Sequence, residues 1–162
     1  MTANIKTLVS RLYRYISEGD WEQVDGFFAP QVIEHQVFSC SRHVIKDYRL
    51  LYGHFRAAFP DLAITVESLY AMGGKVISRF NLSGSLQKPF LYFTPRQQAV
   101  QVSGIDVFRF QRDKIVEHWG TIDQLSLFRQ LDSNSTYQHI TLPLPDTRAL
   151  FQEGVMSRGA QS

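Results

Sequence analysis

Apolar residues recur at helical spacing through the first thirty positions of the chain. Residues three and four apart share one face of a helix, and this spacing predicts a first helix with apolar positions Ile5, Leu8, Val9, Leu12, Tyr15 and Ile16. Gly19 is expected to stop it. Asp20 and Gln23 are spaced as an N-cap and its capping-box partner. They predict a second helix that buries Val24, Phe27 and Phe28 and ends at Pro30.

A short strand and a third helix are expected next. "QVIEHQVF" alternates, which predicts a strand with His35 on its more apolar face, together with Ile33 and Val37. Ser41 can cap a third helix, closed by "FPD" at 59–61 because the residue before a proline leaves the helical region. The apolar stripe of that helix consists of Val44, Tyr48, Leu51, Phe55 and Ala58.

From Leu62 the apolar period changes to two, which predicts antiparallel strands. "LAITVESLYA" and "KVISRFNLSG" flank Gly73-Gly74 and form a predicted hairpin. "AVQVSGIDVFRFQ" and "KIVEHWGTID" form a second hairpin around residues 111–114, followed by a short helix, "QLSLFRQL". "KPFLYFTPRQQ" is broken by two prolines and is expected to be an edge strand or a loop.

Helices followed by a run of strands favour an α+β fold, with helices packed on one face of a sheet. The sheet is expected to curl around the helices and enclose a ligand cavity. Residues 1–131 are expected to form this domain. Periodicity is lost from Asp132, where serine, proline and glycine are frequent, so 132–162 is predicted to be a partly extended or disordered extension.

Composition narrows the range of partners. The 162 residues fit one domain, and a net charge of +2 without a basic stripe gives little support to nucleic-acid binding. The single cysteine, Cys40, can form no internal disulfide. No apolar stretch approaches the ~20 residues that span a bilayer, and the N-terminus lacks a signal segment. We therefore expect a cytoplasmic protein without membrane contact.

Candidate chemistry is concentrated in "KIVEHWGTID". In a regular strand, Glu117, Trp119 and Asp123 share one face with Ile115 and Thr121, while Val116 and His118 share the other. A carboxylate in apolar surroundings can act as a base near neutral pH because desolvation raises its pKa. The same aspartate precedes a helix, and pattern alone favours a capping role for it.

Three stretches carry a resemblance: "GDWEQVDGFFAPQVIEH", "FRAAFPDLAITVESLYAMGGKVISRFNLSG" and "GIDVFRFQRDKIVEHWGTIDQLSLFRQL". In consistent order, from about Ile5 to Leu131, they resemble the SnoaL-like polyketide cyclases of the nuclear transport factor 2 superfamily. "AFPD" and the closing Asp-Lys-Ile-x-Glu-x-Trp pattern are the most specific pieces. The resemblance implies a cone: a strongly bent antiparallel sheet around three helices, with a pocket at the wide end.

The resemblance also implies cofactor-free and metal-free ring closure of a small hydrophobic carbonyl compound by intramolecular aldol condensation. Asp123 would be the base and His35 a second catalytic residue, although a buried structural histidine is an equal alternative. Asp123 is then expected to point into the cavity, near Trp119 and within reach of His35 or Arg79. The expected substrate-binding residues are Arg79, Glu117, Trp119, Asp106 and Tyr13.

The roles of Arg79 and Asp106 stay open. Arg79 could orient an anionic or carbonyl group, or it could pair with Glu117 or Asp106. Asp106 is expected to pair with an arginine rather than to catalyse. Family members commonly carry a Thr-His pair after "LSG", where this chain has Leu86, so the substrate is expected to differ.

A non-catalytic binding or interaction module, or a hydrolase or isomerase, could use the same fold. A homodimer through the open sheet face is expected.

Overall fold

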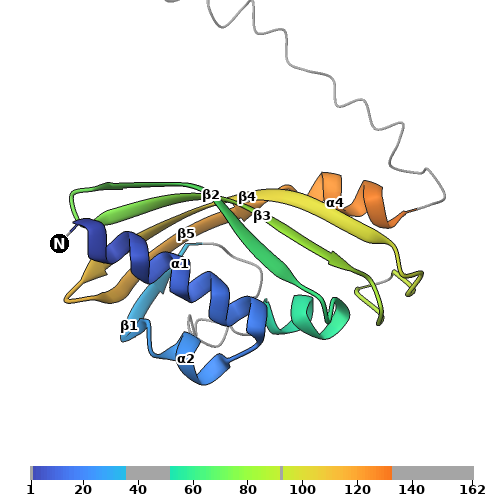
Figure 1. The fold of residues 1–162 in the computed structure, drawn as a ribbon, viewed down its shortest axis with the longest axis horizontal. Coiled ribbons are helices and arrows are strands. Elements are labelled where there is room, and N and C mark those ends of the chain that lie inside the picture. The colour runs from blue at the N-terminus through green and yellow to red at the C-terminus, as the bar shows by residue number, and fades with distance from the viewer. Residues whose placement is uncertain (1, 36–51, 92, 133–162) are drawn as a thin grey trace, which may run out of the picture.

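The computed structural model describes residues 2–35, 52–91 and 93–132. Besides a helical segment at residues 52–58, its elements are α1 (Thr2–Glu18), α2 (Trp21–Asp25), β1 (Phe28–Glu34), β2 (Ala63–Met72), β3 (Lys75–Ser85), β4 (Ala99–Gln111), β5 (Lys114–Ile122) and α4 (Gln124–Leu131). Figure 1 shows a bent sheet with α1, α2 and the 52–58 helix on one side. The predicted α+β class with a curved sheet is confirmed.

The five strands lie in the order β1-β5-β4-β3-β2. The pairs β2–β3, β3–β4 and β4–β5 are antiparallel, as the two predicted hairpins require. The edge strand β1 pairs with β5 in the parallel direction. The sheet is therefore mixed rather than purely antiparallel.

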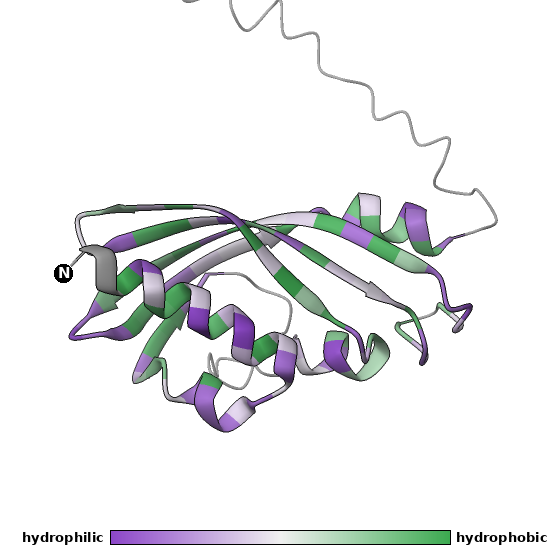
Figure 2. Cartoon of the chain, viewed as in Figure 1, coloured by the Kyte–Doolittle hydropathy of each residue, from purple (hydrophilic) through white to green (hydrophobic). Residues whose placement is uncertain are grey.

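The core lies between α1 and the inner face of the sheet, the face that the helices cover. Leu12 and Ile16 of α1 are fully buried, as are Phe80 on β3 and Phe108 on β4. Figure 2 shows apolar and hydrophilic residues alternating along the strands, as a sheet with one covered face requires. A Cβ on Gly104 would lie 2.3 Å from the Phe80 ring, so this glycine makes room for that ring.

The start of α2 is confirmed and its end is not. The Gln23 amide donates to Asp20 Oδ1 at 3.2 Å, and Gly19 has a φ of 76°. The helix ends at Asp25 rather than Pro30, and Phe28 begins β1. Pro30 lies in a strand instead, which is possible because β1 is at the edge of the sheet and needs no amide donor on its open side.

Both hairpin turns have left-handed backbone at their two central residues. Gly73 and Gly74 have φ values of 58° and 77°, and Arg112 and Asp113 have 49° and 61°. Such turns match the twist of the flanking strands. In the second hairpin the register shifts by one residue between Arg109 and Phe110, which marks a β-bulge.

The proline-broken segment after β3 is a loop with one isolated bridge, Phe90 to Phe93, and both rings are buried. The end of the predicted third helix is present at 52–58, with Phe55 and Ala58 buried as expected. Its proposed cap, the rest of its stripe, Val37, Cys40 and the extension after Asp132 lie outside the described residues. None of the helices in the described ranges is long and apolar enough to cross a membrane.

Candidate functional site

The β-bulge in the second hairpin decides which side chains of β5 face the interior. Phe110 pairs with Ile115, but Arg109 pairs with Glu117, so Val116 is the extra residue. Ile115 and His118 are consequently both buried against the core. The prediction of a regular strand, with Ile115 on the face of Glu117, is therefore wrong at this point.

Asp123 lies outside the core. It is exposed and caps α4, where its carboxylate accepts hydrogen bonds from the Ser126 amide at 2.9 Å and the Ser126 hydroxyl at 2.6 Å. These two donors, the hydroxyl first, lower the pKa of the Asp123 carboxyl. The expectation of a cavity-facing carboxylate near Trp119 is wrong, and the capping interpretation from the sequence pattern is confirmed.

The other residues expected around Asp123 also lie on the outer face, the face of the sheet away from α1. His35 Nε2 is 2.9 Å from Glu117 Oε1, and the Arg109 guanidinium binds the second oxygen of the same carboxylate. The His35 ring stacks on Trp119, with centroids 4.6 Å apart, and the Lys75 ammonium lies 5.0 Å from the Trp119 ring centroid. The structure thus brings these predicted residues together, but outside the interior.

His35 faces outward because of the way β1 alternates. Ile33 is 52% exposed, whereas Val32 is buried, and the Glu34 side chain is only 8% exposed. The prediction that Ile33 and His35 form the core-facing side of this strand is therefore wrong.

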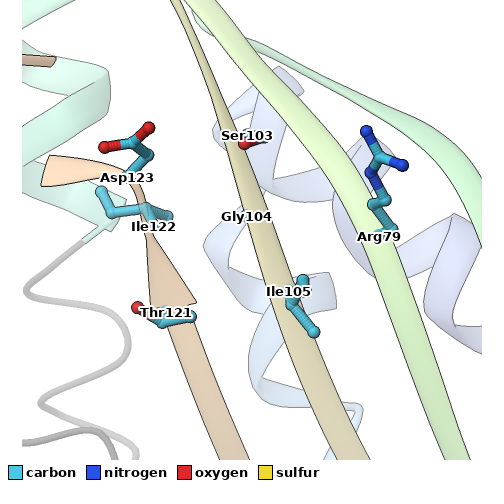
Figure 3. A pocket seen from close by; sticks show the side chains of 7 residues that line it. All are labelled: Arg79, Ser103, Gly104, Ile105, Thr121, Ile122 and Asp123. Atoms are coloured by element: carbon cyan, nitrogen blue, oxygen red, sulfur yellow. The ribbon is translucent and has the colours of Figure 1, made fainter. Parts of the chain in front are cut away.

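Arg79 and Asp123 line one shallow pocket of about 230 Å³ on the outer face. Figure 3 shows their side chains on opposite sides of the β4 segment that carries Ser103, Gly104 and Ile105. Arg79 Nε lies 2.7 Å from Glu67 Oε2. Its partner is thus neither of the two acids considered from the sequence, because both Arg79 and Glu67 lie on the hairpin of β2 and β3.

The interior holds a different set of polar side chains, joined in series. The Tyr13 hydroxyl donates to Asp106 Oδ2 at 2.7 Å. The second oxygen, Asp106 Oδ1, lies 3.2 Å from His118 Nε2, and His118 Nδ1 lies 2.7 Å from Glu34 Oε2. The Asp106–His118 contact is an ion pair when the ring is protonated. We call Tyr13, Asp106, His118 and Glu34 the interior cluster.

Four separate elements supply the interior cluster. Tyr13 comes from α1, Asp106 from β4, His118 from β5 and Glu34 from β1. Tyr13, Asp106 and His118 are at most 1% exposed, and the His118 ring stacks on Phe108 with centroids 4.8 Å apart. Groups buried this deeply are costly unless they pair with one another, as they do here.

The surroundings strongly perturb two of these groups. Burial lowers the pKa of His118, but the Asp106 and Glu34 carboxylates outweigh it and bring the pKa to about 9. Burial, followed by the Asp106 charge, raises the pKa of the Tyr13 hydroxyl well above its usual value. At neutral pH the cluster therefore contains an imidazolium and a neutral phenol beside its two acidic side chains, which is a combination suited to moving a proton.

Ser78 is a further buried polar group beside the cluster. It is directly opposite Asp106 in the β3–β4 register and fully buried. Its hydroxyl lies close enough to Tyr13 to lower the pKa of that phenol. Its Oγ nevertheless makes no hydrogen bond of standard geometry within the described part of the chain. A hydroxyl in this state can accept or donate one more bond, to water or to a ligand.

Sequence reasoning found part of this cluster. It named Tyr13 and Asp106, and both side chains are buried in the structure. The predicted arginine partner of Asp106 is wrong, because a tyrosine and a histidine occupy its two oxygens. Glu34, Ser78 and His118 were missed. Among the described residues, no group of three His, Cys, Asp or Glu side chains is arranged to hold a metal ion.

Comparisons with known proteins agree with this architecture. The family model for SnoaL-like polyketide cyclases matches residues 6–131. AclR from Streptomyces galilaeus, described as a candidate hydroxylase, is similar in structure, with 25% identity, a TM-score of 0.71, and coverage of 81% of this chain and 97% of AclR. No curated protein matches the chain.

Two further solved structures have the same fold. TsrD from Streptomyces laurentii has 25% identity and a TM-score of 0.72, covering 81% of this chain and 96% of TsrD. A candidate polyketide cyclase from Acidithiobacillus ferrooxidans has 25% identity and a TM-score of 0.69, covering 78% and 93%. Since the family model spans most of the chain in the order of its folded elements, the chain belongs to the SnoaL-like polyketide cyclase family.

Proposed function

We propose that the chain catalyses cofactor-free acid–base chemistry of the cyclase type on a small hydrophobic carbonyl compound, and that the interior cluster carries it. The observation behind the proposal is the buried Asp106 carboxylate, which lies between a phenol donor and a histidine. Membership of the family supplies the reaction class. The cluster supplies the groups that such a reaction needs.

Intramolecular aldol closure requires two proton movements. A base removes a proton from the carbon next to a carbonyl, the resulting carbanion attacks a second carbonyl carbon, and the new alkoxide then takes up a proton. We assign the first step to Asp106 and the second to the Tyr13 hydroxyl. The 2.7 Å bond between them lets the proton held by Asp106 return to the tyrosinate. The reaction then balances without a net gain or loss of protons.

The surroundings of the cluster suit this chemistry. Phe80 and Phe108 pack against Tyr13, with ring centroids 5.1 Å and 6.1 Å away, and both rings are fully buried. In such apolar surroundings the electrostatic interactions of the cluster are stronger than in water. The spare hydrogen-bonding capacity of the Ser78 hydroxyl adds a donor for the enolate oxygen. The substrate would therefore be apolar apart from its carbonyl groups.

Proton abstraction can be tested without knowing the natural substrate. The probe is 2-tetralone in D2O, with deuterium uptake next to its carbonyl followed by NMR. We expect the wild type to accelerate uptake and Asp106→Asn to lose about 10²-fold or more of that acceleration. Circular dichroism checks that this variant is folded, and Tyr13→Phe provides a second variant at the same site.

Asp123→Asn is the matched control, because Asp123 is the base that the family resemblance predicts. If Asp106 is the base, Asp123→Asn exchanges deuterium at the wild-type rate. If instead the Asp123 variant is inactive and Asp106→Asn retains its rate, the assignment to the interior cluster is wrong. Uptake by the wild type that does not exceed the rate in buffer would contradict acid–base activity on such ketones.

We also propose a homodimer that pairs through the outer face of the sheet. Tyr70, Ile77, Val107 and Trp119 are neighbours in the strand register and form an apolar row across four strands. Ile77 is 43% exposed and Tyr70 is 64% exposed. An open apolar row of this kind favours pairing with a second copy. Light scattering should show a dimer that Ile77→Arg dissociates, whereas Leu91→Arg, at an exposed apolar residue outside the row, leaves it intact.

A further inference from the structure

The two nitrogens of the buried His118 ring both face carboxylates. Glu34 Oε2 is 2.7 Å from Nδ1, and Asp106 Oδ1 is 3.2 Å from Nε2. The histidine side chain is 0% exposed, and the carboxylate side chains are 8% and 2% exposed. A neutral imidazole carries one N–H, which the short contact between Nδ1 and Glu34 uses, whereas the imidazolium also presents a positively charged N–H toward Asp106. The geometry therefore favours the charged ring.

The backbone holds Glu34 in this position. Glu34 is directly opposite His118 in the parallel register of β1 and β5, and the next amide, that of His35, donates to the His118 carbonyl at 2.9 Å. The bulge in β5 turns the His118 side chain inward, onto the side where Val32 and Glu34 lie. The contact is thus built by strand pairing and does not depend on a mobile loop.

We propose that Glu34 is a positioning residue, which acts through His118 to hold the Asp106 side chain in the position from which it reacts. Glu34 keeps the ring charged and fixes its orientation, so that the positive Nε2 side faces Asp106. The attraction between Nε2 and Asp106 Oδ1, 3.2 Å apart, then leaves Oδ2 with the Tyr13 hydroxyl, on the side where the proton is passed on. This inference rests on the function proposed above, since it assigns a role to a residue that lies one step away from the base.

The charged groups around the ring support the same reading. Within the described ranges, Asp106 on β4 and Glu34 on β1 are acids in contact with His118, and Tyr13 on α1 reaches it through Asp106. Burial lowers the pKa of His118, and these two carboxylates raise it. Without the Glu34 charge, Asp106 remains to oppose the effect of burial on the pKa of His118. The imidazolium should therefore lose its proton, and become neutral, at a lower pH.

The test uses Glu34→Gln, which keeps the size of the side chain and removes its charge. Glu67→Gln is the matched control, since Glu67 pairs with Arg79 on the outer face. Long-range ¹H–¹⁵N NMR reports the protonation of both His118 nitrogens across pH 6 to 10. We expect Glu34→Gln to lower the midpoint of this titration by at least about one pH unit, which corresponds to a tenfold change in the protonation equilibrium. Glu67→Gln should leave it unchanged.

Deuterium uptake by 2-tetralone gives the second readout. Glu34→Gln should lose about fivefold or more of the exchange rate at pH 9, where a midpoint lowered by one unit leaves few of its rings charged, and recover most of it at pH 6, where His118 is charged again. A loss that is equal at both pH values, or an unchanged His118 titration, would overturn the positioning role while leaving the Asp106 assignment in place. If the titration shifts but the wild type itself shows no exchange, the catalytic proposal is the one that fails.

Discussion

The buried histidine gives the stability of this protein a pH dependence that can be measured directly. His118 has a pKa of about 9 in the folded chain against an ordinary value of 6.5. Because the folded pKa is raised, the stabilisation is fully present below pH 6.5 and is lost as the pH rises through 9. One pKa unit corresponds to ~1.36 kcal/mol, so the free energy of unfolding should fall by about 3 kcal/mol across this window.

Urea unfolding between pH 6 and pH 9.5, followed by circular dichroism, measures this change. The perturbation is His118→Asn, which removes the titrating ring. The variant should be less stable than the wild type at pH 6, because it leaves buried carboxylates without their cation. Its stability should also fall much less between pH 6 and pH 9. Parallel curves for the two proteins would refute the reasoning. If the variant does not fold, NMR titration of His118 in the wild type decides the same question, and a midpoint near 6.5 would refute it.

Three further predictions follow from single contacts. Gly104→Ala places a Cβ within 2.3 Å of the Phe80 ring and should cost about 1–3 kcal/mol in thermal or urea unfolding, whereas Gly53→Ala, with nothing within 4 Å, should be neutral or stabilising; equal effects would contradict the packing argument. Asp123→Ala removes the cap of α4 and should cost about 1 kcal/mol, and no loss in urea unfolding would contradict the capping role. Tyr13→Phe removes a buried hydrogen bond to a carboxylate and should cost about 1–3 kcal/mol at pH 7, which an unchanged unfolding midpoint would contradict.

Much of the fold was predictable from local signals. The spacing of apolar residues located α1 and the long strands, and Gly73-Gly74 located the first hairpin turn. Both capping aspartates, Asp20 and Asp123, were recognisable because each stands just before a helix. Each accepts a hydrogen bond from the backbone amide three residues later. These features depend on neighbours in the chain, so the chain itself specifies them.

The interior cluster could not be predicted in this way, because a single bulge decides which side of β5 faces the core. If the hairpin register of Phe110 and Ile115 continued unshifted, Asp106 would pair with Trp119, and the face of Glu117 and Trp119 would turn inward. The extra residue in β5 reverses this, so that Asp106 pairs with Gly120 and His118 turns toward the core. A shift of one residue moves every later side chain to the other face.

The sequence by itself located α1, α4, the two hairpins and the Asp20 and Asp123 caps, and it indicated the family of this protein. Only the tertiary structure decided which acids are buried, because the four residues of the interior cluster come from α1, β1, β4 and β5 and meet through strand register. A bulge has no strong residue signature, whereas its consequence for side-chain direction extends to the end of the strand. That is why Asp106, His118 and Glu34 occupy the interior, whereas Asp123, the base that the family resemblance implied, caps α4 outside the core.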